Sequence, residues 1–232
     1  MSNDFLLIKE NCEKVRQRVR DAALRAGRNP DDIHIIAVSK TVDVDRIKAA
    51  IDCGITDLGE NRVQELVEKF DKIDVKCNWH LIGHLQTNKV KYIIDRVKMI
   101  HSLDSLELAE EIQKRAEKAG RCVDVLVQVN VSSEKTKFGV KQEETLELVR
   151  KLSRMGNIKV KGLMTIAPLA EDPESVRWVF SGLRKLFIDI KKENIDNIDM
   201  DYLSMGMSND FEVAIEEGAN MVRIGTAIFG KR

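Results

Sequence analysis

A lysine that could form an imine stands at the end of the first predicted strand. The apolar run Ile33–Ser39 is typical of a short buried strand, and Lys40 follows it directly. Asp43 is the expected cap of a helix that reaches about Cys53. Loss of water around Lys40 would favour the neutral amine, which is the form that attacks a carbonyl. Taken alone, a lysine in this pattern is more often solvated or salt-bridged.

Two later segments, which follow the seventh and eighth predicted strands, suggest a phosphate site. Ser204–Asp210 leads into a helix, and Gly206 would let the backbone come close to a ligand. Arg223–Thr226 supplies Gly225 and a hydroxyl from the neighbouring strand. Barrels frequently bind phosphate with the loops after these two strands. Singly, Ser208 is more simply a helix cap and Gly225 relieves crowding; together the two segments favour phosphate.

Arg223 needs a partner of its own. It lies between Val222 and Ile224, so strand alternation turns it to the face opposite these two apolar side chains. An unpaired charge inside a barrel is costly. The partner is either a ligand acceptor or one of three internal carboxylates: Glu60, Asp104 or Asp201. An imine-forming amine, a phosphate cradle and a buried arginine together describe a site for pyridoxal phosphate.

Short apolar runs alternate with helical patterns, after an amphipathic helix over about residues 4–26. The predicted strands are Ile33–Ser39, Asp57–Gly59, Trp79–Gly83, Met99–Leu103, Val123–Val131, Lys159–Ile166, Tyr202–Met205 and Met221–Phe229. The helical patterns between them are Asp43–Cys53, Arg62–Lys72, Thr87–Arg96, Ser105–Lys118, Gln142–Arg154, Pro173–Lys192 and Asn209–Glu217.

This alternation predicts a parallel sheet, and eight strands are the number that closes a barrel. The rival architecture is an open doubly wound sheet, which often carries a Gly-rich turn after its first strand. Here that turn is Ser39–Thr41, without a G-x-G-x-x-G pattern. We therefore predict an α/β protein with one domain over residues 1–232, a single (β/α)8 TIM-type barrel with an extra N-terminal helix.

The composition argues against nucleic acid and membranes as partners and predicts a cytoplasmic location. Lys+Arg and Asp+Glu both total 38, so there is no general attraction to nucleic acid or to an anionic membrane. The four cysteines show no C-x-x-C pair or metal-ligand spacing, and we expect Cys53 and Cys122 in the core. No signal peptide or membrane-length apolar run is evident. We expect a cytoplasmic monomer without a metal site.

Seven segments carry a resemblance to a known family: Ala37–Thr41, Gly59–Glu65, Trp79–Lys89, Lys137–Gly139, Gly162–Thr165, Leu203–Ser208 and Val222–Gly230. Together they resemble the pyridoxal phosphate homeostasis protein family over nearly the whole chain. The resemblance implies a fold-type III barrel like the N-terminal domain of alanine racemase. It also implies that Lys40 holds the cofactor as a Schiff base, and that Arg223 faces the pyridine nitrogen.

The resemblance assigns the other cofactor-binding residues as well. The phosphate would be bound by Ser208, Gly225 and Thr226, with backbone from the turn that contains Ser204 and Gly206. The ring or the mouth would be lined by Asn61, His84 and Met164. The expected cofactor is pyridoxal 5'-phosphate.

Three functions are compatible with such a site. The first is a carrier that buffers or delivers pyridoxal phosphate, with cofactor-dependent apoenzymes as possible recipients and no evident turnover. The second is an amino-acid racemase, which needs a second base opposite Lys40. The sequence ends two residues after Gly230, and its tyrosines, Tyr92 and Tyr202, fall within the predicted barrel. No second base is therefore evident. The third is a barrel enzyme that forms an imine with a phosphorylated metabolite. The first is our expectation.

Overall fold

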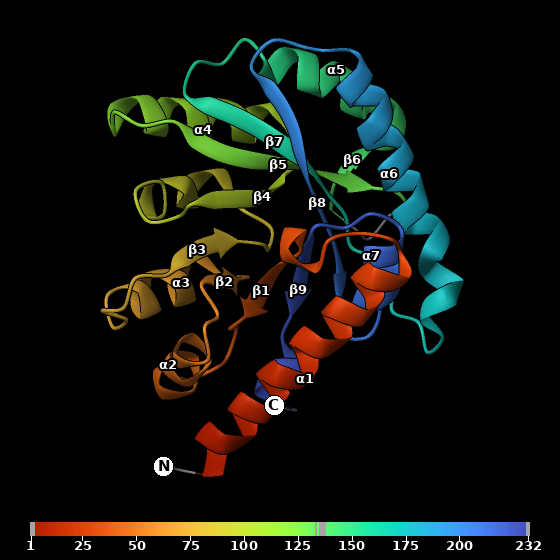
Figure 1. The fold of residues 1–232 in the computed structure, drawn as a ribbon. Coiled ribbons are helices and arrows are strands. Elements are labelled where there is room, and N and C mark those ends of the chain that lie inside the picture. Colours follow the sequence, from red (N-terminus) through yellow and green to blue (C-terminus); the bar gives the residue numbers. More distant parts are fainter. Residues whose placement is uncertain (1–2, 133, 135–137, 231–232) are drawn as a thin grey trace.

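Parallel strands close into a barrel at the centre of the molecule (Figure 1). The computed structural model describes residues 3–132, 134 and 138–230. Within these residues, the eight barrel strands are β1 (His34–Val38), β2 (Asp57–Glu60), β3 (Asn78–Leu81), β4 (Met99–Leu103), β5 (Val123–Asn130), β7 (Ile158–Met164), β8 (Ile198–Met207) and β9 (Met221–Ile224). Each pairs in parallel with the next, β4 pairs with β5, and β9 pairs with β1. The predicted (β/α)8 barrel is confirmed, and the open sheet is wrong.

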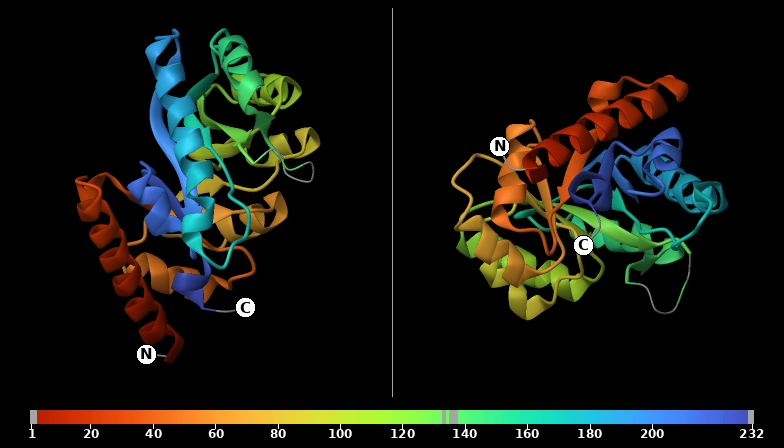
Figure 2. Two further views of the ribbon diagram at one scale, coloured as in Figure 1. Left: turned by 90° about the vertical axis from the view of Figure 1, so that its right-hand side faces the viewer. Right: turned by 90° about the horizontal axis from the view of Figure 1, so that it is seen from below.

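Helices surround the strands. The α-helices of the described chain are α1 (Asn3–Arg25), α2 (Val44–Asp52), α3 (Val63–Phe70), α4 (Leu106–Lys118), α5 (Gln142–Leu152), α6 (Arg177–Lys192), α7 (Phe211–Glu216) and α8 (Thr226–Phe229). Short 3-10 helices are η1 (Pro30–Asp32), η2 (Thr87–Tyr92) and η3 (Pro173–Val176). Helix α1 runs along the outside of the barrel and packs on α2, α7 and α8 (Figures 1 and 2). It therefore covers the side on which the last helix, α8, is only one turn long.

The elements differ from the predicted ones mainly at their ends. The last strand stops at Ile224, because Gly225 leads directly into α8 and Ile228 and Phe229 are buried on that helix. The pattern near Thr87–Arg96 forms the 3-10 helix η2 rather than an α-helix. A two-residue strand, β6 (Val140–Lys141), pairs with the end of β5 and was not predicted.

The apolar core has two parts. The larger part lies mainly between the strands and the helices, while a small cluster fills the barrel interior: Ile36, Met99, Leu126, Met164 and Met221. Of the cysteines, Cys12 is buried and Cys53 is half-buried and packed against the core, whereas Cys122 is exposed, so the expected core placement is wrong for Cys122. Among the described residues, no helix is long and apolar enough to cross a membrane.

Candidate functional site

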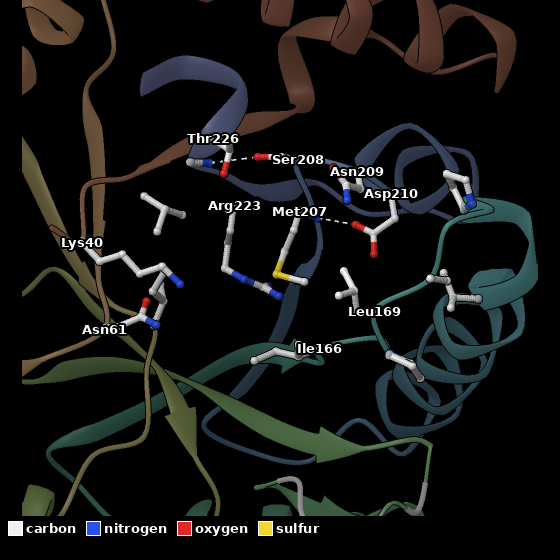
Figure 3. A pocket seen from close by; sticks show the side chains of 17 residues that line it. Lys40, Asn61, Ile166, Leu169, Met207, Ser208, Asn209, Asp210, Arg223 and Thr226 are labelled. Atoms are coloured by element: carbon white, nitrogen blue, oxygen red, sulfur yellow. Dashed lines mark hydrogen bonds between the residues drawn. The ribbon is translucent and has the colours of Figure 1, made fainter. Parts of the chain in front are cut away.

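A pocket of about 220 Å³ opens at the carboxyl ends of the strands (Figure 3). One wall comes from β1, β2 and β9 and the segments after them, with Lys40, Asn61 and Arg223. The other wall comes from the end of β8 and from the loop that follows β7. Since the carboxyl ends of barrel strands are where binding and catalytic groups gather, this pocket is the candidate site.

Lys40 reaches into the pocket from a tight turn after β1, and its side chain is exposed. The desolvation expected from the sequence is therefore not observed. Among the described residues, no hydrogen bond or ion pair occupies its amine. The next residue, Thr41, has a φ of 58°, a left-handed conformation that is uncommon for a non-glycine residue. Its backbone N–H donates to Oε2 of Glu65 at 2.8 Å.

A buried ion cluster holds this turn from behind. The Nζ atom of Lys69 donates to the carbonyl of Ser39 at 2.7 Å, to Oε1 of Glu60 at 2.7 Å and to Oε2 of Glu65 at 3.2 Å. Ser39 Oγ also donates to Oε1 of Glu60 at 2.7 Å. Burial raises the pKa of Glu60, and the bonds from Lys69 and Ser39 oppose that rise. The backbone that carries Lys40 is thus fixed, while its amine has no partner in the part of the chain that the structure describes.

Unlike Lys40, Arg223 is buried, with only 3% of the residue exposed. Its Nη1 donates to Ser204 Oγ at 2.6 Å, and its Nη2 donates to the Thr165 carbonyl at 2.8 Å. Burial lowers the pKa of Arg223 to about 10, against the attraction of Asp210. The guanidinium reaches into the pocket between Met207 and Ile166 (Figure 3).

The internal carboxylate partners considered for Arg223 all have other partners. Glu60 pairs with Lys69, Asp104 with His84, and Asp201 with Lys161. In the described chain, Arg223 forms no ion pair within 4.0 Å. Its N–H groups that face the pocket are therefore open to a ligand acceptor. Of the two partners considered for Arg223, the structure thus favours a ligand over an internal carboxylate.

The two predicted phosphate segments do meet at one side of the pocket. The hydroxyl oxygen of Ser208 accepts from the backbone N–H groups of Gly225 at 3.2 Å and Ala227 at 3.3 Å. Ser208 is not a helix cap, because α7 begins three residues later at Phe211. Ser208, Gly225 and Thr226 all line the pocket. Ser208 and Thr226 lie side by side there (Figure 3).

Gly206 has a different role from the predicted one. Its φ is +91°, and a Cβ atom there would lie 2.6 Å from the Cβ of Ala214 and 2.9 Å from the Cα of Phe211. The close approach is therefore between β8 and α7 rather than between backbone and ligand. Gly206 shapes the turn that carries Ser208 without lining the pocket itself.

The other predicted residues are divided between the pocket and its surroundings. Asn61 lines the pocket, while Met164 belongs to the interior cluster and Ser204 lies behind Arg223. His84 stacks on Phe138, with ring centroids 3.9 Å apart, and its Nδ1 lies 3.4 Å from Oδ2 of Asp104. Lys137, in one of the family motifs, lies outside the described residues.

Some lining residues were missed by the sequence reasoning. Asp210 accepts from the Met207 backbone N–H at 2.6 Å, and burial raises the pKa of its carboxyl. An apolar wall comes from the segment between β7 and α6: Ile166, Pro168, Leu169, Ala170, Pro173 and Val176. The two prolines after the sixth predicted strand were a usable signal, because they break a helix or strand and indicate a loop at the barrel mouth.

Comparison with known proteins defines the class. Residues 8–232 match the family model described as "Alanine racemase, N-terminal domain". An alanine racemase of Clostridium difficile 630 has the same fold, with a TM-score of 0.75 at 17% identity, over 96% of this chain and 60% of that one. The protein is thus a barrel of the alanine racemase N-terminal type.

Closer relatives narrow the class to a family. A "Pyridoxal phosphate homeostasis protein" of Aquifex aeolicus (strain VF5) is 49% identical over 224 residues, which is 96% of this chain and 97% of that protein. PipY of Synechococcus elongatus PCC7942, solved with pyridoxal phosphate bound, is 30% identical with a TM-score of 0.84, over 96% of this chain and 100% of that one. The chain belongs to the pyridoxal phosphate homeostasis protein family.

Proposed function

We propose that the protein binds pyridoxal phosphate as a Schiff base on Lys40 and serves to hold, buffer or deliver it within one barrel domain over residues 1–232. The observation that carries the proposal is the exposed Lys40 amine, which has no partner among the described residues, at the edge of a pocket that also holds Arg223 and Ser208. When bound, this cofactor supplies an aldehyde that condenses with amines and a ring that withdraws electrons.

The residues of the pocket fit the three parts of the cofactor. The Lys40 amine is accessible to an aldehyde. The Ser208 oxygen is already held by two backbone N–H groups, so this corner binds oxygen acceptors, as a phosphate requires. Arg223 presents N–H donors from a buried position, which suits a neutral ring nitrogen. Asn61 and Thr226 complete the predicted contacts to the cofactor. His84 would contribute a further contact near the mouth of the pocket.

Two features favour holding over turnover. An arginine beside the ring nitrogen disfavours its protonation, so the ring is a weaker electron sink. In the described lining, the titratable side chains are Lys40, Asp210 and Arg223, and neither tyrosine is among them. A second base opposite Lys40, of the kind that racemisation needs, is therefore not supplied by a tyrosine of this lining.

The cofactor proposal is tested by the visible absorbance of the purified protein after loading with pyridoxal phosphate. We expect an imine band in the wild type and in Lys72→Ala, a control that removes an exposed surface lysine. Lys40→Ala should lose the band. A band that persists in Lys40→Ala, or none in the loaded wild type, would contradict the proposal.

The absence of turnover is tested separately. The loaded protein is incubated in deuterium oxide with single enantiomers of amino acids, and the Cα hydrogen is followed by NMR. We expect no sustained exchange above that of free pyridoxal phosphate. Lys40-dependent exchange over many cycles would instead establish the racemase-like alternative.

Delivery to apoenzymes and a monomeric, cytoplasmic state also belong to this proposal. We expect one chain per particle by light scattering. We also expect a cofactor-free apoenzyme to recover activity when it is mixed with the loaded protein. Recovery no faster than with an equal concentration of free pyridoxal phosphate would contradict delivery.

A further inference from the structure

We propose that Asp57, His80, His101 and Ser204 are positioning residues of Arg223, joined to it by a hydrogen-bond chain that crosses the barrel interior. These five residues are called the interior chain below. The inference rests on the proposed function, because Arg223 is there assigned to the ring nitrogen of the cofactor.

The interior chain runs from the amino end of β2 to the pocket. The Nε2 atom of His80 lies 2.9 Å from Oδ1 of Asp57, and its Nδ1 lies 2.9 Å from Nε2 of His101. The Nδ1 atom of His101 lies 3.0 Å from Ser204 Oγ, which also accepts from Nη1 of Arg223 at 2.6 Å. The residues come from β2, β3, β4, β8 and β9, so the bond between His101 and Ser204 joins strands that are not neighbours in the sheet.

When both imidazoles of the interior chain are neutral, its two ends fix the direction of every hydrogen bond. A guanidinium only donates and an ionised carboxylate only accepts. With both imidazoles neutral, Asp57 requires a hydrogen on Nε2 of His80, which leaves Nδ1 of His80 as an acceptor. His101 must then donate from Nε2 and accept at Nδ1, so the hydroxyl hydrogen of Ser204 points to His101. Ser204 is thereby left as an acceptor for Arg223.

The surroundings favour this arrangement. His101 and Ser204 are fully buried and His80 is 1% exposed, beside the apolar interior cluster, so water does not offer alternative partners. Burial, with the nearby His80 and Arg223, holds the pKa of His101 well below its ordinary value. Burial acts to raise the pKa of Asp57, but hydrogen bonds from His80, Thr56 and Asn78 outweigh it and leave that pKa well below its usual range.

If the hydrogen bonds of the interior chain ran in the opposite direction, Arg223 would be held less firmly. A hydrogen on Nδ1 of His101 would have to point at Ser204 Oγ, and the hydroxyl hydrogen of Ser204 would lose its acceptor. A second hydrogen on His101 would also place a positive charge close to the guanidinium. The neutral tautomers therefore leave Nη1 and Nη2 of Arg223 with fixed acceptors, Ser204 and Thr165, and turn the remaining N–H groups to the pocket.

Two of the buried serines allow a matched test. Ser204→Ala removes the hydroxyl that links Arg223 to His101. Ser102→Ala removes an equally buried hydroxyl on β4 that has no hydrogen-bond partner among the described residues. We expect pyridoxal phosphate to dissociate about tenfold more readily from Ser204→Ala, since a hydrogen bond to a charged group is lost, and Ser102→Ala to match the wild type.

The second readout needs no cofactor. In protein labelled with ¹⁵N at histidine and arginine, we expect His80 and His101 to carry hydrogen on Nε2 alone at about pH 8. Ser204→Ala should lose the single tautomer of His101 and broaden the side-chain signals of Arg223, while Ser102→Ala should change neither. Asp57→Ala should release the tautomer of His80, and Asp57→Asn should restore it, because an amide oxygen still accepts from Nε2.

The outcomes separate the two proposals. A wild type that keeps both tautomers and ordered Arg223 signals but binds no pyridoxal phosphate would overturn the proposed function and leave the positioning role intact. Hydrogen on Nδ1 of His101, or equal cofactor retention and equal Arg223 signals in Ser204→Ala and Ser102→Ala, would overturn the positioning role alone.

Discussion

Lys40 and Arg223 line the same pocket but are held in opposite ways. The Lys40 side chain is exposed and its amine has no partner in the described chain, although the backbone of its turn is fixed. Arg223 is buried and both of its terminal nitrogens are engaged. The difference indicates a division of roles, in which the bond-forming group stays reachable and the recognition group is fixed before the ligand arrives.

The support behind each residue also differs in kind. Behind Lys40 stands a charged cluster of Lys69, Glu60 and Glu65, packed under the turn. Behind Arg223 stands the interior chain, a series of hydrogen bonds that crosses the barrel interior from Asp57. The charged cluster fixes backbone through short charge-assisted hydrogen bonds, whereas the interior chain fixes the orientation of a planar side-chain group.

The largest expected effect is on the Lys40 side. Lys69→Met would leave the fully buried Glu60 without its cation, and we expect a loss of about 3–5 kcal/mol in the free energy of unfolding. Urea unfolding followed by circular dichroism would measure it. Lys72→Met, which breaks an exposed pair with Glu68, should cost about 0.5 kcal/mol or less. Similar losses in the two variants would show that the buried cluster does not hold the turn.

The next effect concerns the turn that carries Ser208. Gly206→Ala puts a Cβ atom against Ala214 and Phe211 in a left-handed conformation, and we expect a loss of about 2–3 kcal/mol. Gly156→Ala, at an exposed glycine with no atom within 4 Å of the added Cβ, is the control and should be close to neutral. Thermal unfolding would compare them. A tolerated Gly206→Ala would mean that β8 and α7 separate more easily than their packing indicates.

A smaller, pH-dependent effect tests the far end of the interior chain. Because the pKa of Asp57 is lower in the folded protein than in the unfolded one, its contribution to stability is full above about pH 4 and is lost as the pH falls further. We expect Asp57→Ala to be less stable than the wild type by about 1–2 kcal/mol at neutral pH, with the gap narrowing below about pH 4. A gap that widens in acid would contradict the sign of this pKa shift.

The smallest effect concerns the carboxylate that holds Thr41. Glu65→Ala removes the acceptor of the Thr41 N–H, and we expect a cost of about 1 kcal/mol with faster hydrogen exchange at that amide. The neighbouring surface variant Glu68→Ala should leave the exchange of Thr41 unchanged. Equal exchange in both variants would indicate that the turn is fixed by Lys69 alone.

The sequence predicted those parts of the site that depend on strand ends. Lys40 follows an apolar run, and Ser208 and Arg223 fall at the ends of later strands, so closing the barrel brings them to one mouth. Strand alternation also correctly predicted that the Arg223 side chain points into the barrel. The barrel itself followed from the number and alternation of elements.

The parts that the sequence did not predict depend on contacts across the barrel. His80 lies within the predicted strand Trp79–Gly83, but nothing in the local pattern pairs it with His101 or joins β4 to β8. The exposure of Lys40 depends on how far its turn projects beyond β1, which residue types do not encode. The packing of Gly206 against α7 likewise depends on the tertiary approach of two elements.

The central claim is that pyridoxal phosphate is attached to the exposed amine of Lys40. The loaded protein is treated with borohydride, which converts a Schiff base into a stable secondary amine, and its peptides are mapped by mass spectrometry. We predict stoichiometric addition on the peptide that contains Lys40. An adduct spread over surface lysines, or an unmodified Lys40 peptide, would contradict the account.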